Sequence, residues 1–532
     1  MLIDIISAKC IGIEAVPVTI EVDVSSGIGI HLVGLADAAV KESLLRTVTA
    51  LQSRGFRIPG KKIVINLAPA DMHKNGSGYD LPIAIGVIAA TEQRQLNRLD
   101  RYLIMGELGL DGSIREVPGA LPFADYALSA GLEGCILPVQ SALEAIDFHG
   151  LRIYGVETLD DVLRILSEPD DSADLLIWNT AAYGEACLKE AMESGPRAMD
   201  FAEIIGQDSA KRGIEIAAAG SHNAILIGPP GSGKSSIAKA VPGILPPLAT
   251  SEAVTASKIW SVAGKKASRY GLMRLRPFRS PHNSSSIPAL IGGGSGDNIL
   301  PGEVSLAQGG VLFLDELCET PKRTLEALRG PMEDRFVVIS RLKAKIRYPA
   351  SFMLIAASNP CPCGYYGEGE RCTCTPGQRA AYLSRLSGPI MDRIDIQLWM
   401  HPVETGALVE RVKGESSASV AKRIALARKI QTERFAGDGI YTNSEMPNAL
   451  QEKHCPLSEE CKKLLEKLIE SLGLSARAFT RIIKISRTIA DLEAAAESLR
   501  TSSPLSPGPI LPRHIAEASS YRFLDRRNFG EL

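Results

Sequence analysis

The chain has 532 residues, of which 45% are hydrophobic and 23% are charged. These proportions are those of folded globular proteins, so disordered, collagen-like and disulfide-scaffold classes are excluded, and the length corresponds to roughly three or four domains. The formal net charge of −2 gives no global attraction to nucleic acid or membranes, so any polyanion site must be a local patch. The 10 cysteines are too sparse for a secreted disulfide framework, and no segment reaches the roughly 20 apolar residues of a spanning helix. We therefore expect a cytoplasmic protein with no membrane contact.

The pattern of apolar residues divides the chain into four parts. Residues 1–166 alternate β-rich with helical segments, which predicts an α/β domain with strands at 11–24, 62–68, 102–108 and 134–137 and helices at 36–54, 81–92 and 120–130. Residues 167–200 mix Pro, Gly and Asp with short apolar groups and predict a linker. Residues 201–402 return to strands and helices, and residues 403–532 are mostly helical in period.

A phosphate-binding loop is the strongest signal in the chain. An apolar strand at 224–227 runs into Gly-Pro-Pro-Gly-Ser-Gly-Lys-Ser at 228–235, a full match to G-x-x-x-x-G-K-[ST]. Backbone N–H groups of such a loop converge on phosphate, Lys234 neutralises the β- and γ-oxygens, and Ser235 ligates Mg²⁺. A glycine-rich turn with a chance lysine is the alternative, which the strand before and the helix after disfavour. The residues expected to hold ATP are Gly228, Pro229, Pro230, Gly231, Ser232, Gly233, Lys234, Ser235 and Ser236.

Two further strands end in residues suited to the same site. The apolar run at 310–314 ends in Asp315 and Glu316, and parallel sheets carry their chemistry at the carboxyl ends of strands. We expect Asp315 to hold the Mg²⁺ shell and Glu316 to polarise the attacking water, although two such acids can also cap a following helix. A third strand at 352–357 is followed by Asn359, which is placed to reach the γ-phosphate or the water.

The order of these motifs resembles the AAA+ ATPase core. The segments at 276–282, 289–294 and 301–306 resemble the magnesium-chelatase-like branch, specifically the YifB/ComM family, and the resemblance covers nearly the whole chain. It implies an α/β fold with a parallel P-loop sheet and a helical lid, and ATP and Mg²⁺ as cofactors. It also implies a homo-hexamer that moves along single-stranded, forked or junction DNA as a branch-migration helicase in recombination.

The resemblance also implies two arginines that complete the ATP site. The arginine finger of the branch maps onto Arg393 in the element at 390–395, with Arg385 as a competing candidate. The second sensor maps onto Arg477 at the start of a lid helix. Such residues stabilise transition-state charge and require a ring of subunits. A surface ion pair is the alternative for each.

A basic segment precedes the strand that leads to Asn359. Arg341, Lys343, Lys345 and Arg347 recur every second residue, so a single strand presents all four to one face. The plain interpretation is a solvated face offset by acids nearby. Related helicases carry a hairpin here that grips phosphates in the ring pore, and the resemblance therefore implies that these four residues contact DNA.

Cys361, Cys363, Cys372 and Cys374 form two C-x-C pairs on either side of a glycine-rich loop. Such a set can surround one Zn²⁺ tetrahedrally, although C-x₂-C is the commoner zinc spacing. Free thiols in a reducing compartment or a redox switch are the alternatives.

The segment at 106–119 and the strand at 134–138 resemble the proteolytic domain of Lon-type proteases. The serine nucleophile of that family belongs at Gly78, with Ser77 one position early, and its lysine falls on Leu121. We interpret residues 1–166 as a degenerate, non-catalytic relative, in which Lys74 is a candidate contact to DNA or a subunit. The alternatives to a DNA motor are a chelatase-type ATPase that remodels a protein partner and an ATP-dependent protease.

Overall fold

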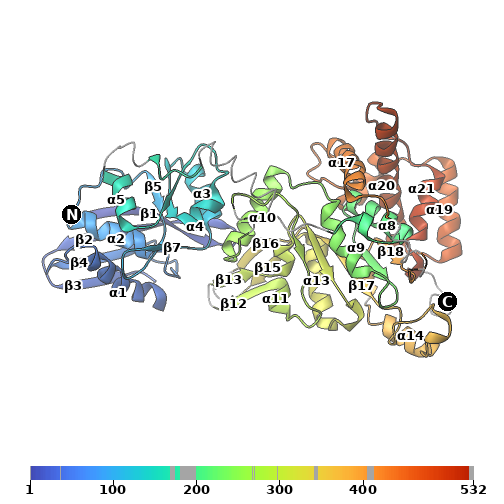
Figure 1. Ribbon diagram of the computed structural model, residues 1–532, viewed down its shortest axis with the longest axis horizontal. Coiled ribbons are helices and arrows are strands. Elements are labelled where there is room, and N and C mark those ends of the chain that lie inside the picture. Colours follow the sequence, from blue (N-terminus) through green and yellow to red (C-terminus); the bar gives the residue numbers. More distant parts are fainter. Residues whose placement is uncertain are drawn as a thin grey trace.

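The computed structural model describes residues 2–35, 37–167, 174–179, 199–266, 268, 270–295, 298–340, 345–386, 388–403, 406 and 413–525. Three units follow one another along the molecule: an N-terminal α/β unit, a core on a parallel sheet, and a helical C-terminal unit (Figure 1). The expected α/β class with a parallel P-loop sheet is therefore confirmed.

The N-terminal unit contains two principal sheets. One has the order β1-β2-β4-β3, and the other is the parallel sheet β5-β8-β9. The first expected strand, at 11–24, is observed as β2, and an additional strand, β1, precedes it and pairs with it across a turn at Gly12, whose φ of +65° suits glycine. The strands are β1 (Leu2–Ile11), β2 (Glu14–Ser25), β3 (Gly29–Val33), β4 (Lys62–Ala68), β5 (Tyr102–Ile104), β6 (Glu107–Leu108), β7 (Ile114–Arg115), β8 (Gly134–Pro138) and β9 (Arg152–Val156). The helices are α1 (Ala38–Ser53), α2 (Asp80–Ala90), α3 (Ala120–Ser129), α4 (Val139–Ala142) and α5 (Leu159–Ser167).

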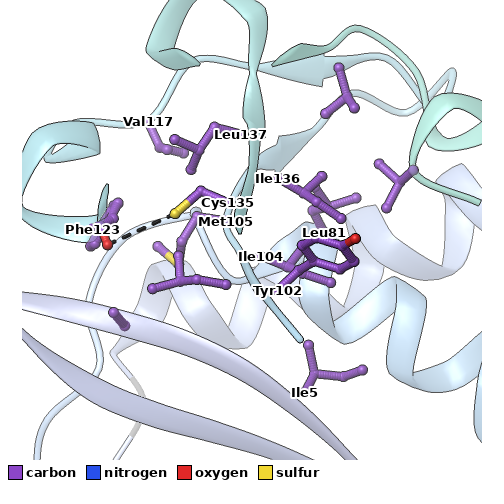
Figure 2. Packing of buried hydrophobic residues seen from close by; sticks show 14 of the residues in the cluster. Ile5, Leu81, Tyr102, Ile104, Met105, Val117, Phe123, Cys135, Ile136 and Leu137 are labelled. Carbon is purple, nitrogen blue, oxygen red and sulfur yellow. Dashed lines mark hydrogen bonds between the residues drawn. The ribbon is translucent and has the colours of Figure 1, made fainter. Parts of the chain in front are cut away.

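A single apolar core joins these two sheets. Helix α2 is apolar on nearly all sides and every one of its residues is buried, as expected of a helix enclosed by other elements. Figure 2 shows Leu81 of α2 and Ile5 of β1 gathered with side chains of β5 and β8. The Cys135 thiol on β8 donates to the Phe123 carbonyl on α3, 3.9 Å away.

The N-terminal unit continues beyond the expected boundaries. Residues 174–179, inside the expected linker, return to β9, where Ile177 forms a bridge with Tyr154. The apolar core of this unit also includes Ala253 and Ala256 of helix α10 (Thr250–Val262) from the following unit. The two units are therefore docked against each other through α10.

The second unit is built on five parallel strands in the order β11-β14-β17-β10-β18. Strands buried on both faces are apolar throughout, which explains the uninterrupted apolar runs in the sequence. The strands are β10 (Ala224–Ile227), β11 (Phe278–Arg279), β14 (Val311–Leu314), β17 (Met353–Ser358) and β18 (Ile396–Trp399). The other helices are α8 (Asp208–Gly220), α9 (Lys234–Ala240), α11 (Ile287–Ile291), α12 (Glu303–Leu306), α13 (Lys322–Asp334), α14 (Pro376–Leu383) and α15 (Gly388–Met391).

Two hairpins of this unit lie on its side facing the N-terminal unit (Figure 1). They pair β12 (Gly292–Ser295) with β13 (Asn298–Pro301), and β15 (Phe336–Ser340) with β16 (Lys345–Pro349). The Tyr348 hydroxyl of β16 donates to the Ile299 carbonyl of β13 at 2.7 Å, which ties the hairpins together.

The third unit is a helical bundle that packs against α8. Its helices are α17 (Ser417–Arg434), α18 (Asn448–His454), α19 (Glu459–Leu472), α20 (Ala476–Thr501) and α21 (Pro512–Ser520). Inside it, the buried Asp491 carboxylate pairs with Arg434 at 2.5 Å and with Arg487 at 3.0 Å, so its charge is compensated. In the described part of the chain, no helix is both long and apolar enough to cross a membrane.

Candidate functional site

The glycine-rich loop connects β10 to α9 at the carboxyl edge of the parallel sheet. Gly231 and Gly233 adopt φ of +78° and +88°, which lets the backbone fold around a small volume. The Lys234 ammonium lies inside this loop and donates to the carbonyls of Gly228 at 2.6 Å and Pro229 at 2.8 Å. Burial lowers the pKa of Lys234, and the charge of Asp315 partly opposes that shift.

The pair of oxygen groups expected to hold Mg²⁺ is assembled at the same edge. The Ser235 hydroxyl donates to the Asp315 carboxylate at 2.9 Å, and the Glu316 N–H donates to the other oxygen of that carboxylate at 2.9 Å. A hydroxyl and a carboxylate are hard oxygen donors of the kind that Mg²⁺ prefers beside phosphate. The donor set therefore fits this ion.

Asn359 joins the loop from the neighbouring strand. Because β17 and β10 are adjacent and parallel, their carboxyl ends meet, and the Asn359 side-chain oxygen lies 3.3 Å from the Lys234 ammonium. The structure thus brings together Lys234, Ser235, Asp315 and Asn359, which the motifs placed at one site.

Two further residues of this site carry no motif in the sequence. The Asn283 amide, in the segment after β11, donates to the Glu316 carboxylate at 2.8 Å, and Glu316 itself has a φ of +50°. The Gln207 amide donates to the Ser232 carbonyl of the loop at 3.1 Å. Strand order is the signal that finds Asn283, since β11 lies beside β14 and their carboxyl ends share one edge.

Arg393 and Arg477 lie together, at a different place. Both line a cavity of about 280 Å³ that also includes Asn223, and Arg393 pairs with Glu333 while Arg477 pairs with Asp392. Asn223 precedes β10, whereas the glycine-rich loop follows it, so the cavity and the loop lie at opposite edges of the sheet, roughly 15 Å apart. Among the described residues, no member of the glycine-rich loop lines this cavity.

Further cations surround the two arginines. Arg335, Arg481 and Lys484 line the same cavity. Burial, with Arg481 and Arg335 nearby, lowers the pKa of Lys484 to about 8. Arg385, the competing finger candidate, lies elsewhere, because its guanidinium pairs with Glu319 at 3.0 Å.

The basic segment is not one strand, so that expectation is wrong. Strands β15 and β16 pair antiparallel with Ser340 opposite Lys345, because an antiparallel pairing buries Ile339 and Ile346 on a common face. Lys345 and Arg347 are exposed on β16 and alternate with the buried Ile346 and Tyr348, as expected. Arg341 and Lys343 lie outside the described residues.

The four cysteines form a compact group. Their sulfur atoms all lie within 4.8 Å of one another, and the separations are 3.3 Å for Cys361 and Cys363, 3.8 Å for Cys361 and Cys372, and 3.7 Å for Cys363 and Cys372. Four thiolates about 2.3 Å from one Zn²⁺ lie about 3.8 Å from each other, so the geometry fits zinc. The backbone N–H of Tyr365 lowers the pKa of Cys363 to about 6, whereas burial raises the pKa of Cys361 to about 12.

The protease-like positions of the N-terminal unit are closed. A Cβ at Gly78 would lie 2.9 Å from the Met105 side chain, and Leu121 is buried. Ser77 donates to Glu107 instead of meeting a lysine. The expectation that Lys74 is available for contacts is wrong, because this side chain is fully buried and donates to the Pro69 carbonyl.

Comparison with known proteins agrees with this arrangement. Family models match three parts of the chain: magnesium chelatase, subunit ChlI, at residues 200–408; subunit ChlI of Mg-chelatase at 20–141; and the ChlI C-terminal part at 414–522. The chain is 42% identical to the protein YifB of Salmonella typhimurium over 97% of its length and 96% of the relative's. It is 40% identical to the competence protein ComM of Haemophilus influenzae, over 98% and 97% of the two lengths.

A Lon protease of Methanocaldococcus jannaschii is 23% identical over 29% of the chain and 24% of its own length. The parallel P-loop core and the chelatase matches define a magnesium-chelatase-like AAA+ ATPase. Within that class, the chain belongs to the YifB/ComM family.

Proposed function

We propose that this protein is a ring-forming Mg²⁺-ATPase that moves along DNA, and that it acts as a branch-migration helicase in homologous recombination or natural transformation. The name of the ComM relative refers to competence, the capacity to take up DNA, which supports a role in this setting. The sparse cysteines of the chain support a cytoplasmic location.

The observation that carries the proposal is the placement of two half-sites at opposite edges of one sheet. Lys234, Asp315 and Asn359 lie at the carboxyl edge, whereas Arg393 and Arg477 lie roughly 15 Å away at the other. Arginines so far from the loop of their own chain serve the loop of an adjacent copy. A head-to-tail contact of this kind repeats around a closed ring, and by resemblance the ring contains six copies.

The test is ATP hydrolysis by the purified full chain, alone and with single-stranded, forked or four-way-junction DNA. We expect DNA to stimulate turnover. Glu316→Gln should lower turnover about a hundredfold or more, because no carboxylate then accepts a proton from the attacking water. Basal hydrolysis of ATP with no response to any DNA would contradict the proposed movement along DNA and would support only the ATPase activity.

Zn²⁺ is the second metal that we propose, held by Cys361, Cys363, Cys372 and Cys374. Sulfur separations of 3.3 to 3.8 Å support it, because they are close to the edge of about 3.8 Å in a zinc–thiolate tetrahedron. Metal analysis of the purified chain should find about one zinc per chain. Metal-free protein that does not take up added Zn²⁺ would contradict the assignment.

A chelatase-type ATPase that remodels a protein partner is the second candidate, because the matching family models are those of magnesium chelatase subunits. The exposed Lys345 and Arg347 of the β15–β16 hairpin favour DNA over this candidate. An ATP-dependent protease is least supported, because Gly78 and Leu121 occupy the positions of its two reacting residues.

A further inference from the structure

The cysteine cluster begins where the nucleotide-contacting residues end. Asn359, whose side-chain oxygen lies 3.3 Å from the Lys234 ammonium, precedes Cys361 by two positions. Cys361 is fully buried, so the first ligand of the cluster is fixed close to the end of β17. Because only one residue separates them, a constraint on the position of Cys361 also constrains the position of Asn359.

The loop between the two cysteine pairs also rests on the glycine-rich loop. Gly364 adopts a φ of +87°, and a Cβ at this position would lie 2.9 and 3.0 Å from two side-chain carbons of Pro230. The same Cβ would lie 3.9 Å from the Asn359 side chain. The backbone at Gly364 thus approaches Pro230 more closely than a residue with a Cβ allows, and it lies within ordinary contact distance of Asn359.

A third contact ties this loop to the sheet. The ring of Tyr366 meets Trp399 edge to face at 6.3 Å, and Arg379 lies 4.1 Å over the Tyr366 ring. Trp399 ends β18, where it pairs with Ile227, the residue that precedes the glycine-rich loop. The loop is therefore anchored to β18, the strand beside the one that leads into the glycine-rich loop.

The loop itself has little regular structure to hold it. Between the end of β17 and the start of α14, its one regular element is the short 3₁₀ turn Gly369–Arg371, and Gly364, Gly367 and Gly369 all have positive φ. A glycine-rich segment loses much conformational entropy when it is ordered, so it needs a cross-link to stay in one conformation. Four thiolates on one metal ion supply that cross-link.

We propose that Cys361, Cys363, Cys372 and Cys374 form a zinc brace that fixes Asn359 and Pro230 around the nucleotide, so that zinc occupancy sets the affinity for ATP. This role rests on the ATPase function proposed above. The four thiols are not among the residues expected to contact the nucleotide, so zinc would act by positioning these two residues.

The first test measures zinc content and the dissociation constant of a fluorescent ATP analogue on the same full-length Glu316→Gln protein, in excess Mg²⁺. Zinc is removed with a chelator, Mg²⁺ is restored, and Zn²⁺ is then added back. We expect removal to weaken binding about tenfold, because a misplaced Asn359 loses about one hydrogen bond to the nucleotide, and we expect re-addition to restore it. Unchanged affinity after loss of zinc would overturn the brace and leave the ATPase standing.

The second test alters the contact between the cysteine loop and Pro230 without replacing any of the four cysteines. Gly364→Ala adds a Cβ against Pro230, whereas Gly369→Ala, also at positive φ (+59°), adds one with nothing within 4 Å. We expect both variants to keep their zinc and only Gly364→Ala to bind the ATP analogue several-fold more weakly. Equal affinities in the two variants would overturn the coupling. Absence of nucleotide binding by the zinc-loaded parent protein would instead overturn the ATPase function itself.

Discussion

Asn283 restrains the residue expected to polarise the attacking water. Its amide donates to the Glu316 carboxylate at 2.8 Å, which directs that carboxylate toward the segment after β11. We expect Asn283→Ala to raise ATP turnover without DNA about fivefold, since a hydrogen bond that contributes about 1 kcal/mol no longer holds the group. Steady-state hydrolysis measures this effect, with Ser285→Ala as the control in the same segment. Turnover equal to or below that of the parent protein would contradict the restraint.

Individual residues were predictable where a local motif names them. Lys234, Asp315 and Asn359 each follow an apolar strand, and parallel pairing brings the ends of these strands together. Asn283 has no such motif, and its role depends on which strand lies beside β14. Lys74 shows a second limit, because a sequence does not reveal that a lysine finds a buried carbonyl such as that of Pro69.

At the scale of elements, the β15–β16 hairpin carries the exposed cations expected to contact DNA. We expect the double change Lys345→Glu and Arg347→Glu to abolish DNA stimulation of ATP turnover and leave basal turnover unchanged, because reversed charges repel phosphate. Hydrolysis with and without DNA measures both quantities. Lys462→Glu, at an exposed lysine of α19, is the control. Undiminished stimulation by DNA in the hairpin variant would show that these residues form a solvated face and do not contact DNA.

Glu144 makes the docking of the first two units sensitive to pH. It lies in the short 3₁₀ helix Leu143–Ala145 and accepts a hydrogen bond from Ser261 of α10 at 2.7 Å. Burial raises the pKa of Glu144 from 4.5 to about 7. Because the folded protein binds this proton more tightly than the unfolded chain, protonated Glu144 adds to the free energy of unfolding. This contribution is fully present below about pH 4.5 and is lost as the pH rises through about 7.

Glu144→Gln removes the charge and keeps an oxygen that accepts from Ser261. We expect this variant to be more stable than the parent by about 2 to 3 kcal/mol at about pH 8.5, and little changed at about pH 5. Thermal unfolding at the two pH values checks this, with Glu116→Gln as the control, since Glu116 is nearby but half-exposed and paired with Lys266. A gain of equal size at both pH values would show that burial of the charge is not the cause.

Elements were predicted well where the pattern is unbroken. The strands at 62–68 and 224–227 have the observed bounds, because short runs rich in Ile, Leu and Val and bounded by polar residues, glycine or proline predict strands. The expectation of a single strand at 339–348 was wrong. Polar and apolar residues alternate both before and after the point where the chain reverses direction, so the alternation does not reveal the turn. Similarly, β1 and β2 alternate on both sides of Gly12.

At the scale of the whole molecule, the two groups of residues that we propose to be halves of one ATP site lie on opposite edges of the core. This separation was not visible in the sequence, which places Arg393 and Arg477 far apart and says nothing of the edge they share. Their pairing with Glu333 and Asp392 shows that these arginines are held in ion pairs within one chain. In a ring, the phosphates of ATP bound to the adjacent subunit would compete with Glu333 and Asp392 for these two arginines.

Mixing two inactive chains tests that arrangement directly. Lys234→Ala removes the loop cation and Arg477→Ala removes a cation of the opposite edge, so each variant alone should hydrolyse ATP at background. If one chain's loop works with its neighbour's arginines, about one quarter of the sites in an equal mixture are intact, whereas none is intact if both serve one chain. We therefore expect co-expressed, doubly tagged complexes to recover about a quarter of the parent turnover. Complexes of Lys234→Ala with the Lys234→Ala/Arg477→Ala double variant contain no intact loop and set the background. ATP turnover no greater than that background would indicate that Arg477 only forms its ion pair with Asp392 and does not serve a neighbouring ATP site. The main argument for a ring would then be lost.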